Sequence, residues 1–326
     1  MERIDDIVKK RPINPFVDWG FKYVFGREEN KDLLIGFLNL LLEPDVAITD
    51  IRHLNSELLG DSPELKRCVV DVIATDKEGN RYLVEMQNAP DLVIRQRLVY
   101  YACRLIDQMG QHRQEWTYGQ IKRVYAICLM NFTYERNATL REDYQLRNEK
   151  GDRLFSDLLT IIPLQIPCIK AKNAKECRKS YEVLLFLLQS MSKRMATREE
   201  LLAEIDTLDL PEQILETFRR VVNTVEDDLT PEQWRDYELD LDKYQRTMGM
   251  IRTGRIEGRE EGREEGREEG RAEGRAEGRA EGLKEGREEG LAEERRRIAK
   301  AMKANDVDID MIIKYCGLSK DEIALL

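Results

Sequence analysis

The chain has 326 residues and an apolar fraction of 41%, which suffices for one sizeable α/β domain with an appendage and excludes a wholly disordered protein. Its net charge of −10 excludes a uniformly basic surface, so any contact with a polyanion must come from local patches. No apolar run has the length of a signal peptide or a membrane span. We therefore expect a cytoplasmic protein that does not enter a membrane.

Six cysteines are scattered along the chain without a CxxC pair, and only two histidines accompany them. A structural zinc site needs four such ligands at short spacings, so the sequence does not indicate one. Most of the cysteines stand in apolar stretches, where a reduced thiol is an ordinary small core residue. We assign no catalytic role to any of them.

The N-terminal region predicts helices followed by strands. Residues 16–42 carry apolar residues at helical spacing on both sides of Gly26, which predicts two helices with Asn30 as the N-cap of the second. Three extended segments rich in β-branched residues follow, at residues 48–59, 67–76 and 80–89. The turn residues 77–80 should join the last two segments in a hairpin.

A long amphipathic helix is predicted from residue 91 to about 115, with an apolar face made of Leu92, Leu98, Val99, Ala102, Leu105, Ile106 and Met109. Residues 122–132 are apolar enough for a strand buried on both faces, which is typical of a sheet covered by helices. A further strand is predicted over residues 158–167. Helices should then continue to about residue 222 and again from Pro231. The predicted class is α/β.

From Gly254 to Gly290 a glycine recurs at every fourth position, separated mostly by Arg, Glu and Ala. On a helix this glycine stripe advances about 40° per repeat, so a partner that followed it would coil in the right-handed sense. Each glycine costs about 1 kcal/mol relative to alanine, and we expect the segment alone in water to be frayed or disordered. Two interpretations stay open: a solvated variable spacer, or an oligomerising stalk whose small residues let another helix approach.

Helical spacing returns after the repeat, and Gly317 and Ser319 predict a helix stop followed by an N-cap. Helices of this size cannot bury a stable core alone, so docking or self-association is the favoured use. A contact to DNA is the alternative, because the segment opens with three arginines. The predicted domains are residues 1–250, the repeat at 251–294, and a helical tail at 295–326.

Asp71 and Glu85 are acidic residues within apolar strands, in the segments VVDVIA and LVEMQN. Strand periodicity places Glu85 and Gln87 on one face of the hairpin and turns Met86 away. A buried carboxylate is costly unless it is paired or binds a metal, and its oxygens suit Mg²⁺ or Mn²⁺. The pattern alone leaves open a metal site, a solvent-facing pair, or ion pairs with Arg81, Lys66 or Arg97.

Several segments closely resemble, in this order, the PD-(D/E)XK nuclease family transposases, relatives of the recombination-promoting (Rpn) nucleases: NPFVDWGFKYVFG, LLIGFLNLLL, VVDVIATDKEGNRYLVEMQN, RLVYYACRL and RVYAICLMNF. The resemblance covers roughly residues 14–250 and is strongest to about residue 132. It implies a restriction-endonuclease-like fold, in which helices flank a central mixed sheet, followed here by a helical C-terminal extension. It also implies divalent-metal-dependent DNA cleavage associated with recombination, mobile elements or defence.

The resemblance carries over to individual residues. Asp71 is similar to the family's metal-binding aspartate, Glu85 to its second acidic ligand, and Gln87 stands where classical members have lysine. Asp18 resembles the family's N-terminal acidic residue, which would add an outer metal ligand. Two nearby cations are candidates for a phosphate contact, Lys22 and Arg97.

Glutamine at position 87 can orient a water molecule, but it cannot act as a base or add positive charge beside a phosphate. We therefore expect a nuclease that is slow or tightly regulated. One alternative is an inactive nuclease-fold protein that binds DNA or a partner and assembles through the repeat and the tail. Another is a transposase that catalyses strand transfer, because both reactions use an oxygen nucleophile on the same phosphate.

Overall fold

The computed structural model of the chain describes residues 11–326 except 56, 59–67, 111–116 and 136. Lys66 lies outside the described residues. The helix expected over residues 91–115 is shorter than predicted, because it spans only Ile94–Asp107 and a turn follows it at residues 108 and 109. The chain forms two compact units, Met1–Ile251 and Arg252–Leu326. None of the helices within the described ranges is long and apolar enough to cross a membrane.

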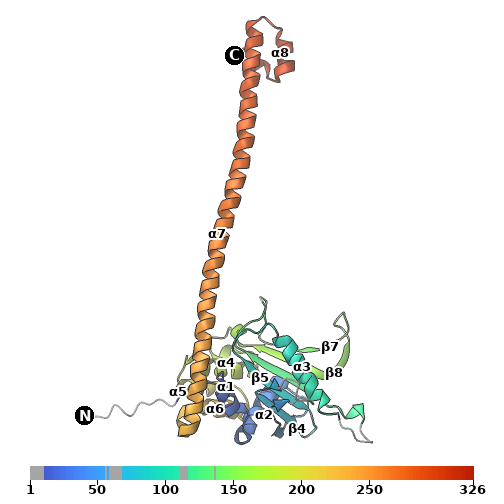
Figure 1. The fold of residues 1–326 in the computed structure, drawn as a ribbon, viewed down its shortest axis with the longest axis vertical. Coiled ribbons are helices and arrows are strands. Elements are labelled where there is room, and N and C mark those ends of the chain that lie inside the picture. Colours follow the sequence, from blue (N-terminus) through green and yellow to red (C-terminus); the bar gives the residue numbers. More distant parts are fainter. Residues whose placement is uncertain (1–10, 56, 59–67, 111–116, 136) are drawn as a thin grey trace, which may run out of the picture. The chain divides into compact units, whose positions relative to one another are not determined.

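The first unit is built around a six-stranded mixed sheet with the strand order β1-β4-β5-β6-β8-β7 (Figure 1). The strands are β1 (Ile51–His53), β4 (Val72–Asp76), β5 (Arg81–Gln87), β6 (Val124–Met130), β7 (Tyr144–Arg147) and β8 (Leu154–Gln165). A separate short pair consists of β2 (Glu57–Leu58) and β3 (Cys68–Val69).

The predicted hairpin is present as β4 and β5, which pair antiparallel with Val72 opposite Val84. Gly79 has φ +88° in the connecting turn, a conformation that glycine adopts without the steric cost of a side chain. The amides of Glu78 and Asn80 donate to the Asp76 carboxylate and fix the turn. The hairpin therefore holds the two strands of the candidate site in one register.

The predicted buried strand β6 lies inside the sheet, where it runs parallel to both β5 and β8. A parallel connection needs a crossover, and α3 (Ile94–Asp107) supplies it between β5 and β6. The edge strand β7 was not predicted, because its four residues are mostly exposed and show no apolar pattern. β8 begins at Leu154, earlier than the predicted residue 158, for the same reason.

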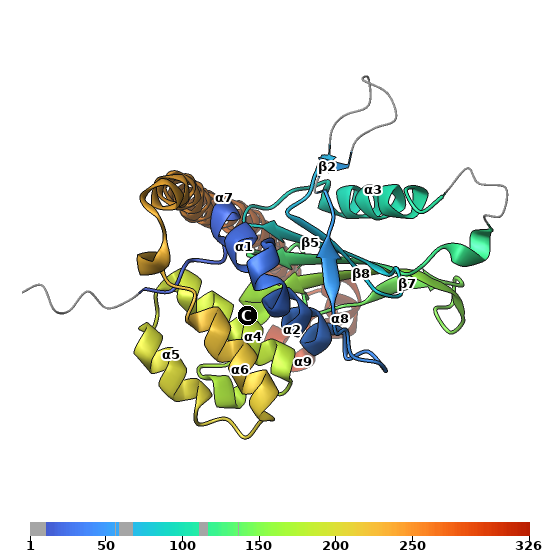
Figure 2. The same ribbon diagram turned by 90° about the horizontal axis from the view of Figure 1, so that it is seen from below.

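Helices cover both faces of the sheet (Figure 2). Alternate strand residues divide between the faces: Val84 and Met86 pack in the larger apolar cluster, whereas Leu83 packs in the cluster beneath α3. The larger cluster is formed with α1 (Asp18–Phe25), α2 (Lys31–Leu42), α4 (Ser180–Lys193), α5 (Arg198–Ile205) and α6 (Glu212–Val222). This arrangement confirms the predicted α/β class.

The predicted N-cap at Asn30 and part of the predicted apolar face of α3 were wrong. Asn30 precedes α2, but its side-chain amide donates to the carbonyl of Tyr23 at 2.8 Å and does not cap the helix. Leu92 is 98% exposed and lies before the first turn of α3, and Val99 is also exposed. The buried face of α3 consists of Ile94, Leu98, Tyr101, Ala102 and Leu105.

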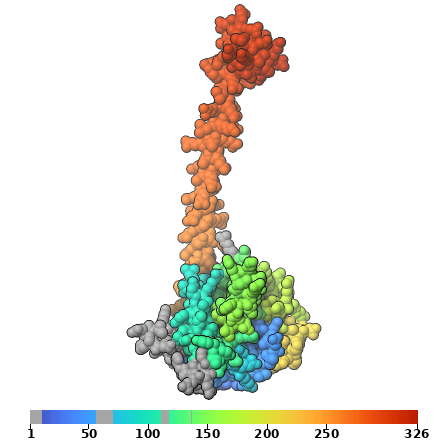
Figure 3. All heavy atoms as spheres, turned by 90° about the vertical axis from the view of Figure 1, so that its right-hand side faces the viewer, coloured from blue at the N-terminus to red at the C-terminus, as the bar shows by residue number. Residues whose placement is uncertain are grey.

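A single helix of 74 residues, α7 (Pro231–Ala304), includes the whole repeat. Its first turns belong to the first unit, where the Tyr237 side chain is fully buried and its hydroxyl donates to Glu226. From residue 252 to residue 298 every residue is exposed, and Figure 3 shows the repeat as a bare column of side chains. The structure therefore gives the repeat a helical backbone without an intrachain partner among the described residues.

The end of α7 packs with α8 (Ile309–Cys316) and α9 (Lys320–Ala324) around a small apolar cluster that includes Ile312 and Ile323. Gly317 ends α8 with φ +66°, and the Ser319 hydroxyl caps α9 in a capping box with Glu322. The predicted helix stop and N-cap are thus confirmed.

Candidate active site

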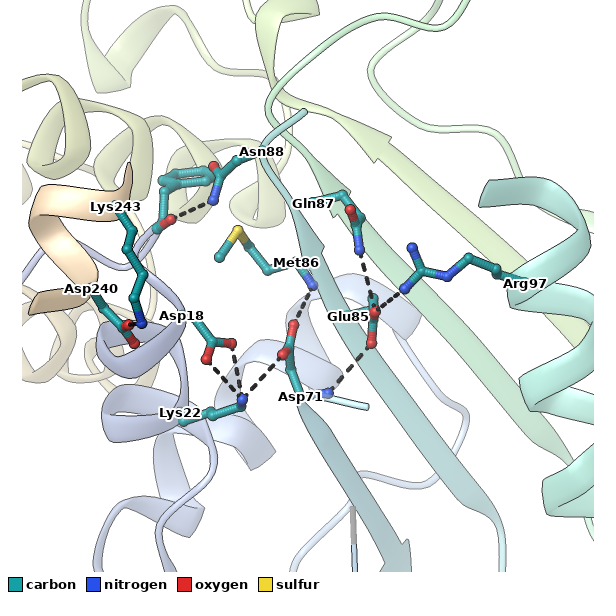
Figure 4. A network of polar contacts seen from close by, with 11 residues as sticks. Asp18, Lys22, Asp71, Glu85, Met86, Gln87, Asn88, Arg97, Asp240 and Lys243 are labelled. Carbon is teal, nitrogen blue, oxygen red and sulfur yellow. Dashed lines mark hydrogen bonds and ion pairs between the residues drawn. The ribbon is translucent and has the colours of Figure 1, made fainter. Parts of the chain in front are cut away.

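The β4–β5 hairpin brings Asp71 and Glu85 together at one end of the sheet (Figure 4). Asp71 stands directly before β4, and Glu85 lies within β5 on the face covered by α3. Gln87 follows two residues later, and its amide Nε2 donates to Glu85 Oε1 at 3.3 Å. Met86 packs into the apolar cluster on the other face. The predicted division of these residues between the two faces of the hairpin is confirmed.

The two acidic side chains are tied to the neighbouring backbone. The Met86 amide donates to Asp71 Oδ2 at 2.8 Å, and the Asp71 amide donates to Glu85 Oε2 at 3.3 Å. Glu85 is only 3% exposed, and the side chain of Asp71 is only 13% exposed. Two carboxylates are therefore held in fixed positions with little access to water.

Two cations neutralise this pair from opposite sides. Arg97 on α3 places one guanidinium nitrogen 3.1 Å from Glu85 Oε1 and another 2.8 Å from Asp91 Oδ2. Lys22 on α1 places its Nζ 3.6 Å from Asp71 Oδ1 and 2.9 Å from Asp18 Oδ1. Both candidate phosphate-contacting residues thus lie at the site, but each is engaged with carboxylates. Arg81 is not one of these partners, because it bonds to the carbonyl oxygen of Leu105.

The surroundings of Asp71 and Glu85 disfavour the ionisation of both carboxyl groups. Burial, together with the charge of Glu85, raises the pKa of Asp71 above its ordinary range. Burial also raises the pKa of Glu85, although Arg97 opposes this shift. Burial lowers the pKa of Lys22, but its contacts with Asp18 and Asp71 outweigh that effect and the net shift is upward. Even with Lys22 and Arg97 present, burial therefore disfavours the ionised form of both carboxylates.

Asp18 is brought near Asp71, but the Lys22 ammonium contacts both carboxylates. No group of three or more His, Cys, Asp or Glu side chains suited to a metal ion occurs among the residues that the structure describes. Asp18 therefore does not join Asp71 and Glu85 in such a group. Asp240 and Lys243 of α7 form an ion pair nearby, with 2.7 Å between Lys243 Nζ and Asp240 Oδ1 (Figure 4).

Sequence reasoning missed Asp91, which anchors the guanidinium of Arg97 and whose other oxygen accepts from the Val93 amide. An acidic residue at the start of a predicted helix was the available signal, because such residues commonly accept bonds from free amides of the first turn. Cys128 pairs with Glu85 across β5 and β6, and burial raises the pKa of its thiol. This thiol is not activated, as expected for a core cysteine.

The donor set at Asp71 and Glu85 fits a hard divalent cation. Both side chains offer carboxylate oxygens, and Mg²⁺ in proteins is typically held by one or two carboxylates together with water and substrate phosphate. Burial raises the pKa of both carboxylates, and at Asp71 the charge of Glu85 raises it further. A divalent cation would favour the ionised form of both groups. The residues present thus suit Mg²⁺ or Mn²⁺ with Asp71 and Glu85 as its ligands, and the outer-ligand role of Asp18 stays a prediction.

A family model described as PD-(D/E)XK nuclease family transposase matches residues 15–247. The chain belongs to this family. The match includes the entire six-stranded sheet and all six predicted site residues. No curated protein and no solved structure matches the chain. Membership gives the first unit its PD-(D/E)XK fold and indicates a nuclease-related role for the protein.

Proposed function

We propose that this PD-(D/E)XK chain is a divalent-metal-dependent deoxyribonuclease that hydrolyses phosphodiester bonds in DNA. The observation that carries the proposal is the pair of buried carboxylates, Asp71 and Glu85, fixed side by side with raised pKa values. A protein gains nothing in stability from two adjacent buried acids, so their retention is best explained by a cation that they hold. Recombination, mobile elements or defence would be the biological setting.

Each residue of the site has a role in this proposal. Asp71 and Glu85 would hold Mg²⁺ or Mn²⁺, which when bound polarises the phosphate and acidifies water. The Gln87 amide donates to Glu85, so its carbonyl oxygen is the group that can accept a hydrogen bond from an attacking water. Lys22 and Arg97 are the cations that can face the phosphate oxygens.

The absence of lysine at position 87 sets the expected rate. Glutamine contributes no positive charge where negative charge develops on the phosphate, so we expect slow turnover unless Lys22 supplies that charge. The same substitution supports the alternative of an inactive nuclease-fold protein that binds DNA or a partner. Strand transfer is the other alternative, and joining of a supplied DNA end that carries a 3′-hydroxyl would reveal it.

A plasmid-nicking assay of the full chain with Mg²⁺, Mn²⁺ or EDTA tests the proposal. We expect wild-type protein to nick DNA with either metal and not with EDTA, and Glu85→Ala to lose at least on the order of a hundredfold in rate. Asp50→Asn is a matched control, because Asp50 lies beside the opposite end of β4 and pairs with Lys31. Full metal-dependent nicking by Glu85→Ala would falsify the assignment.

We also propose that the repeat and the tail mediate self-association of the chain. A methyl group added at any of the ten repeat glycines would meet no atom within 4 Å among the described residues, so no packing contact within that part of the chain requires glycine there. Such small residues allow the backbone of a second helix to approach closely. The alternative remains a solvated spacer between the first unit and the tail, in keeping with the predicted boundaries at residues 251 and 295.

A further inference from the structure

Lys22 occupies the position of a cation beside Asp71. Its Nζ lies 3.6 Å from Asp71 Oδ1 and 2.9 Å from Asp18 Oδ1, so the ammonium bridges the two carboxylates (Figure 4). The other Asp71 oxygen, Oδ2, accepts a hydrogen bond from the Met86 amide at 2.8 Å. Oδ1 is therefore the oxygen through which Asp71 would meet a ligand, and Lys22 faces it.

The two cations of the site differ in how firmly they are held. The Arg97 guanidinium is fixed by bonds to both Glu85 and Asp91 and lies over the ring of Tyr101, with 5.6 Å between Cζ and the ring centroid. Lys22 carries a point charge on a flexible stem, and it is 39% exposed. Its contact with Asp18 is shorter than its contact with Asp71. Lys22 can thus leave Asp71 without losing its other partner.

We propose that Lys22 is the internal counter-ion of Asp71 in the metal-free protein and that a divalent cation displaces it toward Asp18. This inference rests on the proposed function, because it assumes that Asp71 and Glu85 hold the cation. A metal at these carboxylates and an ammonium at its present position would stand within a few ångströms and repel each other. Displacement removes that repulsion and leaves the ammonium beside the more exposed carboxylate of Asp18, where a substrate phosphate would meet it.

The proposal assigns Lys22 opposite effects on two measurable quantities. In the metal-free protein its charge competes with the divalent cation, so removing the charge should strengthen metal binding. In the complex with DNA the displaced ammonium attracts the phosphate, so removing the charge should slow nicking. A residue with a purely structural role would weaken both.

Calorimetric titration of Mg²⁺ into the full chain without DNA tests the inference. We expect Lys22→Met to bind Mg²⁺ on the order of tenfold more tightly than wild type, because one nearby positive charge is lost. Lys22→Arg, which keeps the charge, should stay close to wild type. Titrations are run at about pH 9, so that protons compete little with Mg²⁺ for the Asp71 carboxylate in either protein. Lys31→Met is the matched control, because Lys31 pairs with Glu28 and Asp50 outside the site.

The outcomes separate the two claims. Mg²⁺ binding by wild type with equal or weaker binding by Lys22→Met would overturn the counter-ion role and leave the proposed function standing. Absence of Mg²⁺ binding by both proteins would overturn the proposed function and the inference with it. If Lys22→Met fails to unfold cooperatively in a thermal scan, Lys22→Gln supplies the same comparison, because it removes the charge and keeps a donor for Asp71.

Discussion

The carboxylate site and the glycine repeat are both rich in charged residues, but the charged groups of the two regions have different partners. At the site, Glu85 is buried and receives bonds from Arg97, Gln87 and a backbone amide. In the repeat, between residues 254 and 293, every side chain is exposed, and no ion pair within 4.0 Å joins its Arg and Glu residues in the described structure. The site is thus organised within one chain, whereas the repeat has polar groups and open backbone that only another molecule could engage.

The repeat has a regular surface once it is placed on a helix. Each glycine is flanked on one side by the residue three positions earlier, nearly always arginine, and on the other by a glutamate three positions later. The remaining position lies opposite the glycine and varies among Ile, Glu, Ala and Lys. The regular positions therefore share one side of the helix, and the variable position faces away from it.

The first prediction tests whether the buried charge of the site weakens the fold. The pKa of Asp71 is raised in the folded protein, so its contribution to stability is full below the ordinary carboxyl pKa of about 3.9 and is lost as pH rises through the raised value. Without metal, Asp71→Asn should therefore gain stability relative to wild type between about pH 5 and about pH 8.5, by at least about 1.4 kcal/mol. Urea denaturation in EDTA measures this difference.

A control for this prediction has the opposite sign. The Lys31 ammonium lowers the pKa of Asp50, so Asp50→Asn should lose stability relative to wild type as pH rises from the lowered pKa to the ordinary carboxyl pKa, and the difference should stay constant at higher pH. Added Mg²⁺ should stabilise wild type and not Asp71→Asn, because a ligand stabilises only the state that binds it. Parallel pH profiles for wild type and Asp71→Asn would show that Asp71 is not electrostatically strained.

The second prediction concerns position 87. Gln87→Lys should raise the Mg²⁺-dependent nicking rate by about tenfold, equivalent to roughly 1.4 kcal/mol, because an ammonium would face the developing charge on the phosphate. Gln87→Met, which has a similar size and no charge or amide, is the matched variant and should be slower than wild type. A rate for Gln87→Lys at or below that of wild type would mean that the glutamine performs a task that lysine cannot.

The site was predictable from sequence to the extent that strand periodicity determines it. Glu85 and Gln87 alternate with Met86 along β5, and alternation alone placed them on one face. The Glu85–Arg97 ion pair is one of the pairs that the sequence pattern left open. The Lys22–Asp71 pair was not predictable, because Lys22 lies on a helix about fifty residues earlier in the chain and its contact with Asp71 depends on how α1 packs on the sheet. The edge strand β7 was also not predicted from the sequence, because its exposed residues carry no apolar pattern.

The helicity of the repeat was judged from the free-energy cost of the glycines in its sequence, and the structure shows a helix there.

The third prediction tests the free-energy cost of the repeat glycines. The isolated peptide 251–297 should give a coil spectrum in circular dichroism at low concentration and gain helix as the concentration rises. Replacing three glycines with alanine should raise helicity at low concentration, by about 1 kcal/mol per residue. A coil spectrum at every concentration would exclude pairing and favour the solvated spacer.

The last prediction concerns the orientation of a helix pair. When two such helices face each other through their glycines in parallel, the arginine row of one lies beside the glutamate row of the other, whereas an antiparallel pair sets like charges together. Reversing three arginines to glutamate, at positions 263, 267 and 271, should therefore weaken self-association of the full chain, by roughly 0.2–1 kcal/mol per pair.

Sedimentation equilibrium at low salt measures this change, because added salt screens exposed pairs. The matched variant carries glutamate at five variable positions, residues 272, 276, 280, 284 and 292, which makes the repeat more negative by the same amount as the three reversals and leaves its regular side intact. Equal weakening by both variants would mean that net charge alone controls association. Weakening by the first variant only would assign the contact to the glycine side of the helix.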